Sequence, residues 1–267
     1  MACRPASGNI HPIVDRRYKS WHNSGHTAGR FGARSQGSLV EPLPFLGGDG
    51  LRTYVYVDGF NLYNSGLKQD RSLRWLDIQA MCRGALRAEN DVIGVRYFTA
   101  RISAEDNDPD GPTRQDAYLR ALEAHTQNLS VHFGQFRSER RRRPFAGWVA
   151  GSVGPRTVEV IERSEKGSDV NLAVHLVNDA WADLYDCAVV VSNDSDLAEA
   201  LRIVRSRGKG VGILTTKNRP TGALLAHAHF HRRITNTHFT HSRLPDPVVD
   251  SEGRQISCPV AWQWPLE

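Results

Sequence analysis

The feature that most constrains the fold is a run of five consecutive apolar residues, Cys187–Val191, with polar residues on both sides. Five residues are too few for a buried helix and are typical of a strand. A strand that is apolar on both of its faces is buried on both faces, which happens where helices cover both sides of a parallel sheet. The run therefore predicts an α/β protein with a central parallel sheet.

Strand patterns alternate with helical patterns along most of the remaining chain. We expect strands over residues 53–57, 92–100, 131–136, 157–162, 187–191 and 211–214, and helices over residues 75–86, 115–126, 169–182 and 197–207. Right-handed crossovers between such strands place helices on both faces of the sheet. The predicted architecture is an α/β three-layer sandwich with a central, mainly parallel sheet.

Composition and charge divide the chain into three segments. Of the 267 residues, 40% are hydrophobic and 24% are charged, which excludes whole-chain disorder and fibrous classes. Residues 1–50 carry six basic and three acidic residues without a periodic apolar pattern, so we expect a disordered basic arm there. We expect the globular domain over residues 51–241. Residues 242–267, with four prolines and two tryptophans, form a C-terminal tail that is expected to wrap over the domain.

Several global features bear on location and partners. No apolar run approaches the roughly 20 residues of a membrane span, and the N-terminus lacks the apolar stretch of a secretory signal. The four cysteines are scattered, which argues against a disulfide framework and against a zinc knuckle. We therefore expect a cytoplasmic protein without a membrane partner. The net charge of +5 fits an anionic partner such as nucleic acid without requiring one.

Acidic residues from three separate segments lie where a ligand site is expected. Asp58 follows the first strand, Asp194 and Asp196 follow Cys187–Val191, and Asp169 opens a helix. Ligands of open parallel sheets bind outside the carboxyl ends of the strands, so these side chains should meet at one edge. Carboxylates a few ångströms apart repel by a few kcal/mol, and a divalent cation is the usual compensation. An oxygen-only ligand set favours Mg²⁺ or Mn²⁺ over zinc.

Each of these residues also has a purely structural interpretation. Asp169 and Asp196 could cap helix N-termini, and Asp58 with Gly59 could form a plain turn. All four acidic residues together at strand ends are harder to explain as caps. Three further residues, Asp179, Asp183 and Asp186, lie on or beyond the far end of the predicted 169–182 helix and are expected to contribute only to solubility.

Three sequence blocks resemble the signature blocks of the NYN domain family, which belongs with the PIN-like metal-dependent nucleases. The blocks are YVDGFNLY at residues 56–63, EKGSDVNLA at residues 165–173 and VSNDSDL at residues 191–197. They stand in the order and spacing of the family within residues 52–234. The resemblance implies a PIN-like sandwich whose acidic pocket binds one or two divalent ions, Mg²⁺ or Mn²⁺, and hydrolyses RNA phosphodiester bonds.

The resemblance also implies roles for individual residues. Asn61 resembles an amide that orients substrate or a metal-bound water, and Ser192 resembles the small hydroxyl residue that opens the third block and contacts substrate. Products would carry 5′-phosphate and 3′-hydroxyl ends, and an endoribonuclease is favoured over an exonuclease. The implied catalytic and metal-binding carboxylates are Asp58, Asp169, Asp194 and Asp196.

The strongest local charge run is SERRRR at residues 138–143, between two predicted strands. If this run is a loop beside the acidic edge, its basic side chains could bind RNA phosphates. The alternative is a solvated hairpin tip. The candidate substrate-binding residues of this run are Arg140, Arg141, Arg142 and Arg143.

Two other functions remain compatible with the sequence. Phosphatase-type α/β hydrolases also carry an aspartate after the first strand, but in an Asp-x-Asp motif, whereas Asp58 is followed by Gly59 and Phe60. A non-catalytic RNA-binding or adaptor module could keep a PIN-like fold, although such a module has no need for mutually repelling acids. The identity of the RNA and the oligomeric state stay open at this point.

Overall fold

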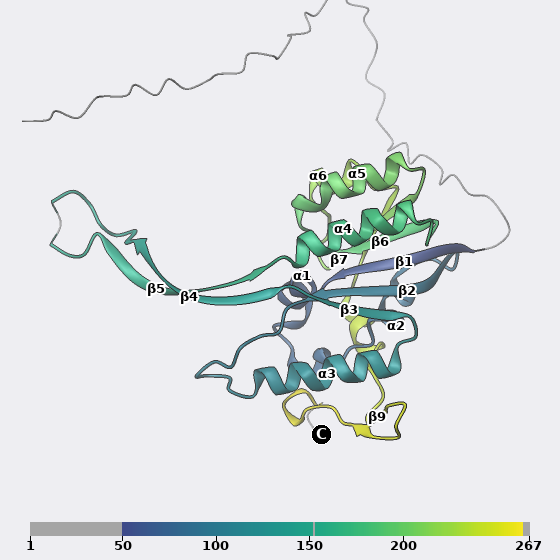
Figure 1. Cartoon of the computed structure of the whole chain (residues 1–267), viewed down its shortest axis with the longest axis horizontal. Helices are drawn as coiled ribbons and strands as arrows, with labels where there is room; N and C mark the ends of the chain where they lie inside the picture. The colour runs from purple at the N-terminus through teal and green to yellow at the C-terminus, as the bar shows by residue number, and fades with distance from the viewer. Residues whose placement is uncertain (1–49, 152, 264–267) are drawn as a thin grey trace, which may run out of the picture. The chain divides into compact units, whose positions relative to one another are not determined.

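A six-stranded sheet forms the centre of the computed structural model, which describes residues 50–151 and 153–263 (Figure 1). The strand order is β3-β2-β1-β6-β7-β8, and every neighbouring pair is parallel. Residues 1–49, nearly all of the predicted basic arm, lie outside the described residues. The strands are β1 (Leu51–Asp58), β2 (Asn90–Thr99), β3 (Leu129–Phe133), β6 (Cys187–Val191), β7 (Gly210–Thr215) and β8 (Phe230–Arg233).

Helices cover both faces of this sheet, so the predicted three-layer α/β sandwich is confirmed (Figure 1). One face packs against α2 (Ile78–Ala85), α3 (Gly111–His125) and α7 (Asn236–Thr240). The other face packs against α4 (Ser168–Trp181), α5 (Ala198–Ser206) and α6 (Gly222–Leu225). Shorter elements are α1 (Gly59–Leu62), η1 (Tyr63–Leu67), η2 (Arg71–Arg74) and η3 (Ser195–Leu197).

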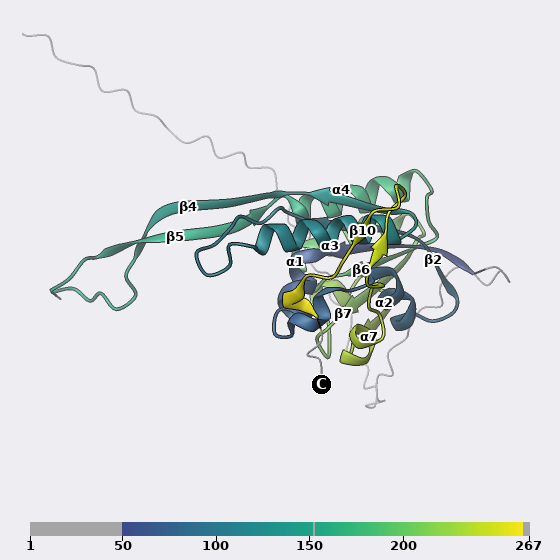
Figure 2. The ribbon, with the colours of Figure 1, turned by 90° about the horizontal axis from the view of Figure 1, so that it is seen from below.

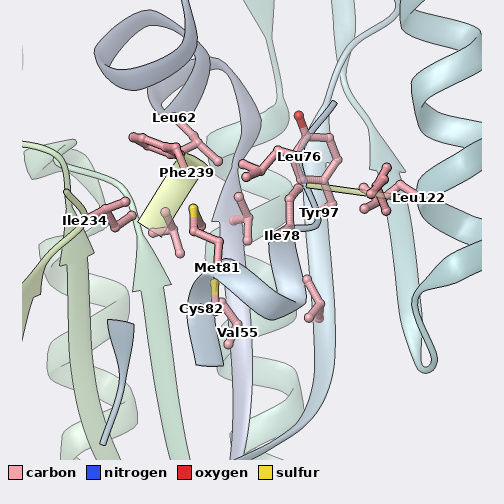
Figure 3. Packing of buried hydrophobic residues seen from close by; sticks show 14 of the residues in the cluster. Val55, Leu62, Leu76, Ile78, Met81, Cys82, Tyr97, Leu122, Ile234 and Phe239 are labelled. Carbon is pink, nitrogen blue, oxygen red and sulfur yellow. The ribbon is translucent and has the colours of Figure 1, made fainter. Parts of the chain in front are cut away.

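The alternation of side chains along β1 explains the two layers. Val55 and Val57 point to the α2 face, where Met81 and Cys82 are fully buried against the sheet (Figure 3). Tyr56 points to the opposite face, among the α4 and α5 side chains. Successive residues of a strand alternate between faces, and each large apolar side chain that is fully buried contributes about 1.5–3 kcal/mol. None of the helices in the described part of the chain combines the length and apolar character needed to cross a bilayer.

A separate antiparallel ribbon, β4 (Gln135–Pro144) with β5 (Thr157–Lys166), continues from the end of β3 (Figure 1). The prediction of one strand over residues 131–136 is wrong, because the chain leaves the central sheet at Gly134. A Cβ atom at Gly134 would lie 2.7 Å from the carbonyl oxygen of Lys166, so only glycine fits this crossing. The prediction of a loop over residues 138–143 is also wrong: the arginine run lies within β4, where Glu159 and Glu162 of β5 offset part of its charge.

The C-terminal residues pack against the α2 and α3 side of the domain (Figure 2). The Trp75 Nε1 donates a hydrogen bond to the carbonyl oxygen of Pro245 at 2.9 Å. Trp262 is 8% exposed, and its ring lies 6.2 Å from that of Tyr118 between centroids. This segment contains β9 (Val248–Val249), β10 (Gln255–Ile256) and η4 (Val260–Trp262).

Candidate active site

An open cleft of about 480 Å³ lies where β1 and β6 end. From β1 the chain proceeds to β2 and β3 on one side, and from β6 it proceeds to β7 and β8 on the other. This reversal of strand order separates the loops that follow the two strands, and it is where open α/β sheets bind ligands. The cleft is lined by Asp58, Phe60, Asn61, Asn64, Ser65, Glu165, Asp169, Asn193, Asp194 and Lys217.

Asp58 is the deepest acidic residue of the cleft, with 5% of its surface exposed. Its Oδ1 accepts a hydrogen bond from the backbone N–H of Asn61 at 2.9 Å, which caps α1, and its Oδ2 accepts one from the Ser192 hydroxyl at 2.9 Å. Burial raises the pKa of the Asp58 carboxyl against the effect of these two donors, and Asp194 and Glu165 raise it further. Both donors are neutral, so the charge of Asp58 has no cationic partner at these hydrogen bonds.

Asp194 and Ser192 position each other after β6. The backbone N–H of Asp194 donates to Ser192 Oγ at 3.1 Å, and Asp194 Oδ1 accepts from the backbone N–H of Asp196 at 3.0 Å. Ser192 is only 2% exposed, so its hydroxyl holds Asp58 and Asp194 in place from behind the cleft. Asp196 is exposed and does not line the cleft.

Asp169 lies in the first turn of α4, two residues after the N-cap Gly167, whose φ of +91° favours glycine. The pKa of the Asp169 carboxyl is raised to about 6, first by burial and then by the charges of other acids around it. Those acids come from the three sequence blocks at residues 56–63, 165–173 and 191–197. They are Asp58, Asp194, Glu165 and Asp196.

Sequence reasoning missed two charged residues that line the cleft. Glu165 is the penultimate residue of β5, and its Oε1 accepts a hydrogen bond from the backbone N–H of Ser168 at 2.9 Å. Lys217 follows β7, and its backbone N–H donates to Thr215 Oγ1 at 3.2 Å. The rule that led to Asp58 and Asp194, inspection of residues just after a strand, would have found Lys217 but not Glu165, which lies within β5.

Asn61 joins the loops that carry the cleft. Its Oδ1 accepts from the backbone N–H of Asn193 at 3.3 Å, and Asn193 Oδ1 accepts from the backbone N–H of Thr221 at 3.1 Å. Loops after β1, β6 and β7 are thereby connected by two amide side chains. This connection orients the cleft before any ligand binds.

The donor set of the cleft fits a hard divalent cation, because it consists of carboxylate and amide oxygens. Within the described residues, no three aspartate, glutamate, histidine or cysteine side chains form a group that could hold a metal ion. Mg²⁺ is usually held by one or two carboxylates together with waters and substrate phosphates, so it does not need a complete protein cage. The residues that would hold it are Asp58, Asp169 and Asp194, with Glu165 beside them.

Two predicted features lie away from the cleft. Arg140, Arg141, Arg142 and Arg143 belong to β4 and are not among the residues that line the cleft. The expectation that Asp179 serves only solubility is wrong: it is 1% exposed and accepts hydrogen bonds from Tyr56 Oη at 2.7 Å and from Arg96 Nε. The partners come from β1 and β2, which a reading of the helix alone does not reveal.

The NYN domain profile matches residues 52–233. This chain belongs to the NYN domain family. Its fold is therefore nuclease-like, a PIN-like sandwich with the acidic blocks at the carboxyl edge of the sheet.

Two further similarities involve individual proteins. A 6-hydroxy-3-succinoylpyridine 3-monooxygenase, HspA, from Pseudomonas putida (strain DSM 28022 / S16) is 28% identical over 217 residues, covering 72% of this chain and 69% of its own length. A crystal structure of a protein of unknown function from Vibrio parahaemolyticus RIMD 2210633 aligns with a TM-score of 0.43 and 16% identity, over 72% of this chain and 98% of that chain.

Proposed function

We propose that this protein is a metal-dependent endoribonuclease that hydrolyses RNA phosphodiester bonds in the cleft. The observation that carries the proposal is the gathering of Asp58, Asp169 and Asp194 at one edge of the sheet. Four carboxylates line the cleft beside a single lysine, so the lining is acidic although its substrate would be a polyanion. Such a lining is explained if divalent cations accompany the phosphate into the cleft.

Hydrolysis of a phosphodiester requires an activated water, a positioned phosphate and stabilisation of the charge that develops on its oxygens. A divalent ion, when bound, supplies a lowered water pKa and positive charge beside the phosphate. The Ser192 hydroxyl holds the Asp58 carboxylate and the backbone of Asp194, and the backbone N–H of Asp196 holds the Asp194 carboxylate. Lys217 offers the cleft an ammonium group that can bind a phosphate oxygen, and the Asn61 amide orients polar groups of the substrate.

The test is cleavage of single-stranded and structured RNA by the purified chain with Mn²⁺ or Mg²⁺ and with EDTA. Asp58→Asn and Asp194→Asn should each lose at least about a hundredfold in metal-dependent rate, because the amide keeps the shape but not the charge. Asp116→Asn is the matched control: Asp116 is a half-exposed aspartate of α3 that does not line the cleft, so this variant should cleave RNA like the wild type. Products should carry 5′-phosphates and 3′-hydroxyls.

Two outcomes would overturn the proposal. One is cleavage that is equally fast in EDTA, and the other is near-normal cleavage by both cleft variants. RNA binding without cleavage in any metal would instead favour the adaptor function. In that case the acidic cleft would serve a purpose other than hydrolysis.

A second candidate is an oxygenation reaction, favoured by the 28% identity to a protein named as a monooxygenase. A monooxygenase consumes O₂ and two electrons for each hydroxylated product. Oxygen uptake by the same preparation with a hydroxylated succinoylpyridine and a reduced nicotinamide distinguishes this reaction from RNA hydrolysis. Substrate-dependent uptake without RNA cleavage would replace the ribonuclease proposal.

A further inference from the structure

The β4–β5 ribbon has two faces, and one of them opens on the cleft. Residues opposite each other in an antiparallel pair share a face, and successive residues alternate between faces. Phe136 lies opposite Glu165, which lines the cleft. The ring of Phe136 stacks on that of Phe60, another cleft residue, with centroids 6.3 Å apart and planes inclined by 11°. The face that carries Phe136 is therefore continuous with the cleft wall.

The arginine run divides between these two faces. Arg140 and Arg142 are in step with Phe136, whereas Arg141 and Arg143 lie on the opposite face. The pairing of β4 with β5 continues over ten consecutive residue pairs without a bulge, so this division persists along the ribbon. Four arginines that look equivalent in sequence thus belong to two different surfaces.

The two surfaces differ in how their charge is compensated. On the far face Arg141 contacts Glu139 at 2.6 Å and Glu162 at 3.8 Å, and Arg143 also pairs with Glu162. On the cleft-side face, Arg140 has a looser contact with Glu159, 3.6 Å between exposed side chains. Arg142 makes no ion pair with any other described side chain. The cleft-side guanidinium groups are the ones available to an external anion.

We propose that Arg140 and Arg142 bind the phosphate backbone of an RNA strand as it leaves the cleft. This inference rests on the proposed function, because the cleft supplies the strand. Guanidinium groups bind phosphate oxygens through paired, charge-assisted hydrogen bonds, which suits a row of phosphates along an exposed strand. The ribbon is then a guide for RNA that extends beyond the reacting phosphate.

The length of the ribbon predicts how long an RNA must be to reach Arg140 and Arg142. Arg140 is four residues and Arg142 six residues beyond Phe136, which is about 13 and 20 Å at a rise of about 3.3 Å per residue. With a phosphate about every 3.4 Å of a stacked strand, these distances correspond to roughly four to six nucleotides. A tetranucleotide spans only three such steps, about 10 Å, and should stop short of both arginines, whereas a 20-nucleotide RNA should extend past them.

The test compares two double variants with the same change of charge. Arg140→Ser with Arg142→Ser should weaken binding of a 20-nucleotide single-stranded RNA about tenfold in EDTA. It should also reduce the slope of log K against log salt by about 1.4, from about 0.7 per phosphate contact. Arg141→Ser with Arg143→Ser should stay within about twofold of the wild type. Neither pair should alter binding of a tetranucleotide.

Thermal melts and a shortened variant guard against misfolding. Joining Arg137 to Ser164 through an Asn-Gly turn removes both arginine faces and keeps Phe136 opposite Glu165. This variant should bind the 20-nucleotide RNA as weakly as the cleft-side double variant and bind the tetranucleotide like the wild type. Equal losses in both double variants, or no loss in either, would overturn the proposal.

Cleavage with Mn²⁺ separates the failure of this inference from the failure of the proposed function. If all ribbon variants cleave and bind RNA like the wild type, the proposed ribonuclease function is upheld and the proposed phosphate contacts of Arg140 and Arg142 are wrong. If the cleft-side variant loses affinity for RNA but the wild type never cleaves it, the phosphate contacts of Arg140 and Arg142 are upheld and the proposed ribonuclease function is wrong.

Discussion

Two buried aspartates, Asp58 and Asp179, show how differently the fold treats a carboxylate. Asp179, on α4, receives the Arg96 guanidinium and the Tyr56 hydroxyl, so its charge is matched inside the protein. Asp58, two residues beyond Tyr56 on the same strand, receives a backbone N–H and the Ser192 hydroxyl, and it faces further acids.

Under the proposed function, this difference separates a structural acid from one that is held ready for a ligand. A buried charge is normally paired, because desolvation without a partner is costly. Asp179 follows this rule, and its pair joins α4 to β1 and β2. The acids around Asp58 depart from this rule, because they face other acids. This arrangement is expected of a site whose counter-ion comes from outside the chain.

The largest effect on folding is expected at Asp179. Asp179→Asn should lower the free energy of unfolding by about 3 kcal/mol, because Arg96 keeps its charge and loses its anion. Urea unfolding at pH 7 measures the loss. The stabilisation by Mn²⁺ should be unchanged, because this residue lies away from the cleft. A change below about 0.5 kcal/mol would show that the pair is dispensable.

Asp58→Asn should behave in the opposite way. The pKa of Asp58 is raised in the folded protein, so ionisation favours the unfolded state and lowers the free energy of unfolding at a pH above that pKa. At pH 7 in EDTA, the free energy of unfolding of the variant should therefore equal that of the wild type or exceed it by about 1 kcal/mol. At ten times its dissociation constant, Mn²⁺ should stabilise the wild type by about 1.4 kcal/mol and the variant much less. Thermal melts with EDTA and with Mn²⁺ provide the measurement. An equal metal-induced shift in both proteins would exclude Asp58 as a ligand.

The smallest effect is a pH dependence beside the Asp179 pair. The ring of His132 packs on those of Phe98 and His175, with centroids 4.9 and 4.1 Å away. Burial lowers the pKa of His132 to about 4, and the nearby His175 and Arg96 contribute to this shift. Because its pKa is about 6.5 in the unfolded chain, stability should fall as the pH drops from about 6.5 towards 4. Partial solvent screening reduces the effect to about 1 kcal/mol between pH 7.5 and 5.

Urea unfolding of the wild type and of His132→Phe at these two pH values tests this expectation. The variant cannot be protonated at this position, so its stability should depend less on pH. Asp58→Asn serves as the comparison, because its pH dependence should retain the histidine contribution. Identical pH profiles for His132→Phe and the wild type would contradict the assignment.

Local patterns in the sequence were sufficient for the fold class and for part of the site. The apolar run Cys187–Val191 is a strand that is buried at every position, and the apolar spacing of the 169–182 segment became α4. Side-chain periodicity reports burial directly, because each residue of a strand or helix faces a fixed direction relative to its neighbours. The carboxyl ends of parallel strands share an edge, which brought Asp58 and Asp194 together without knowledge of strand order.

Only the tertiary structure decided which strands are neighbours and which groups each charged side chain contacts. Placement of β6 beside β1 creates the strand-order reversal at the cleft, and periodicity carries no information about it. Asp179 lies 83 residues from Arg96 and 123 from Tyr56, so its burial depends on partners that no local pattern identifies. The β4–β5 pairing likewise divides four consecutive arginines into two surfaces. Charges act through space across elements distant in sequence, whereas apolar periodicity is a property of a single element.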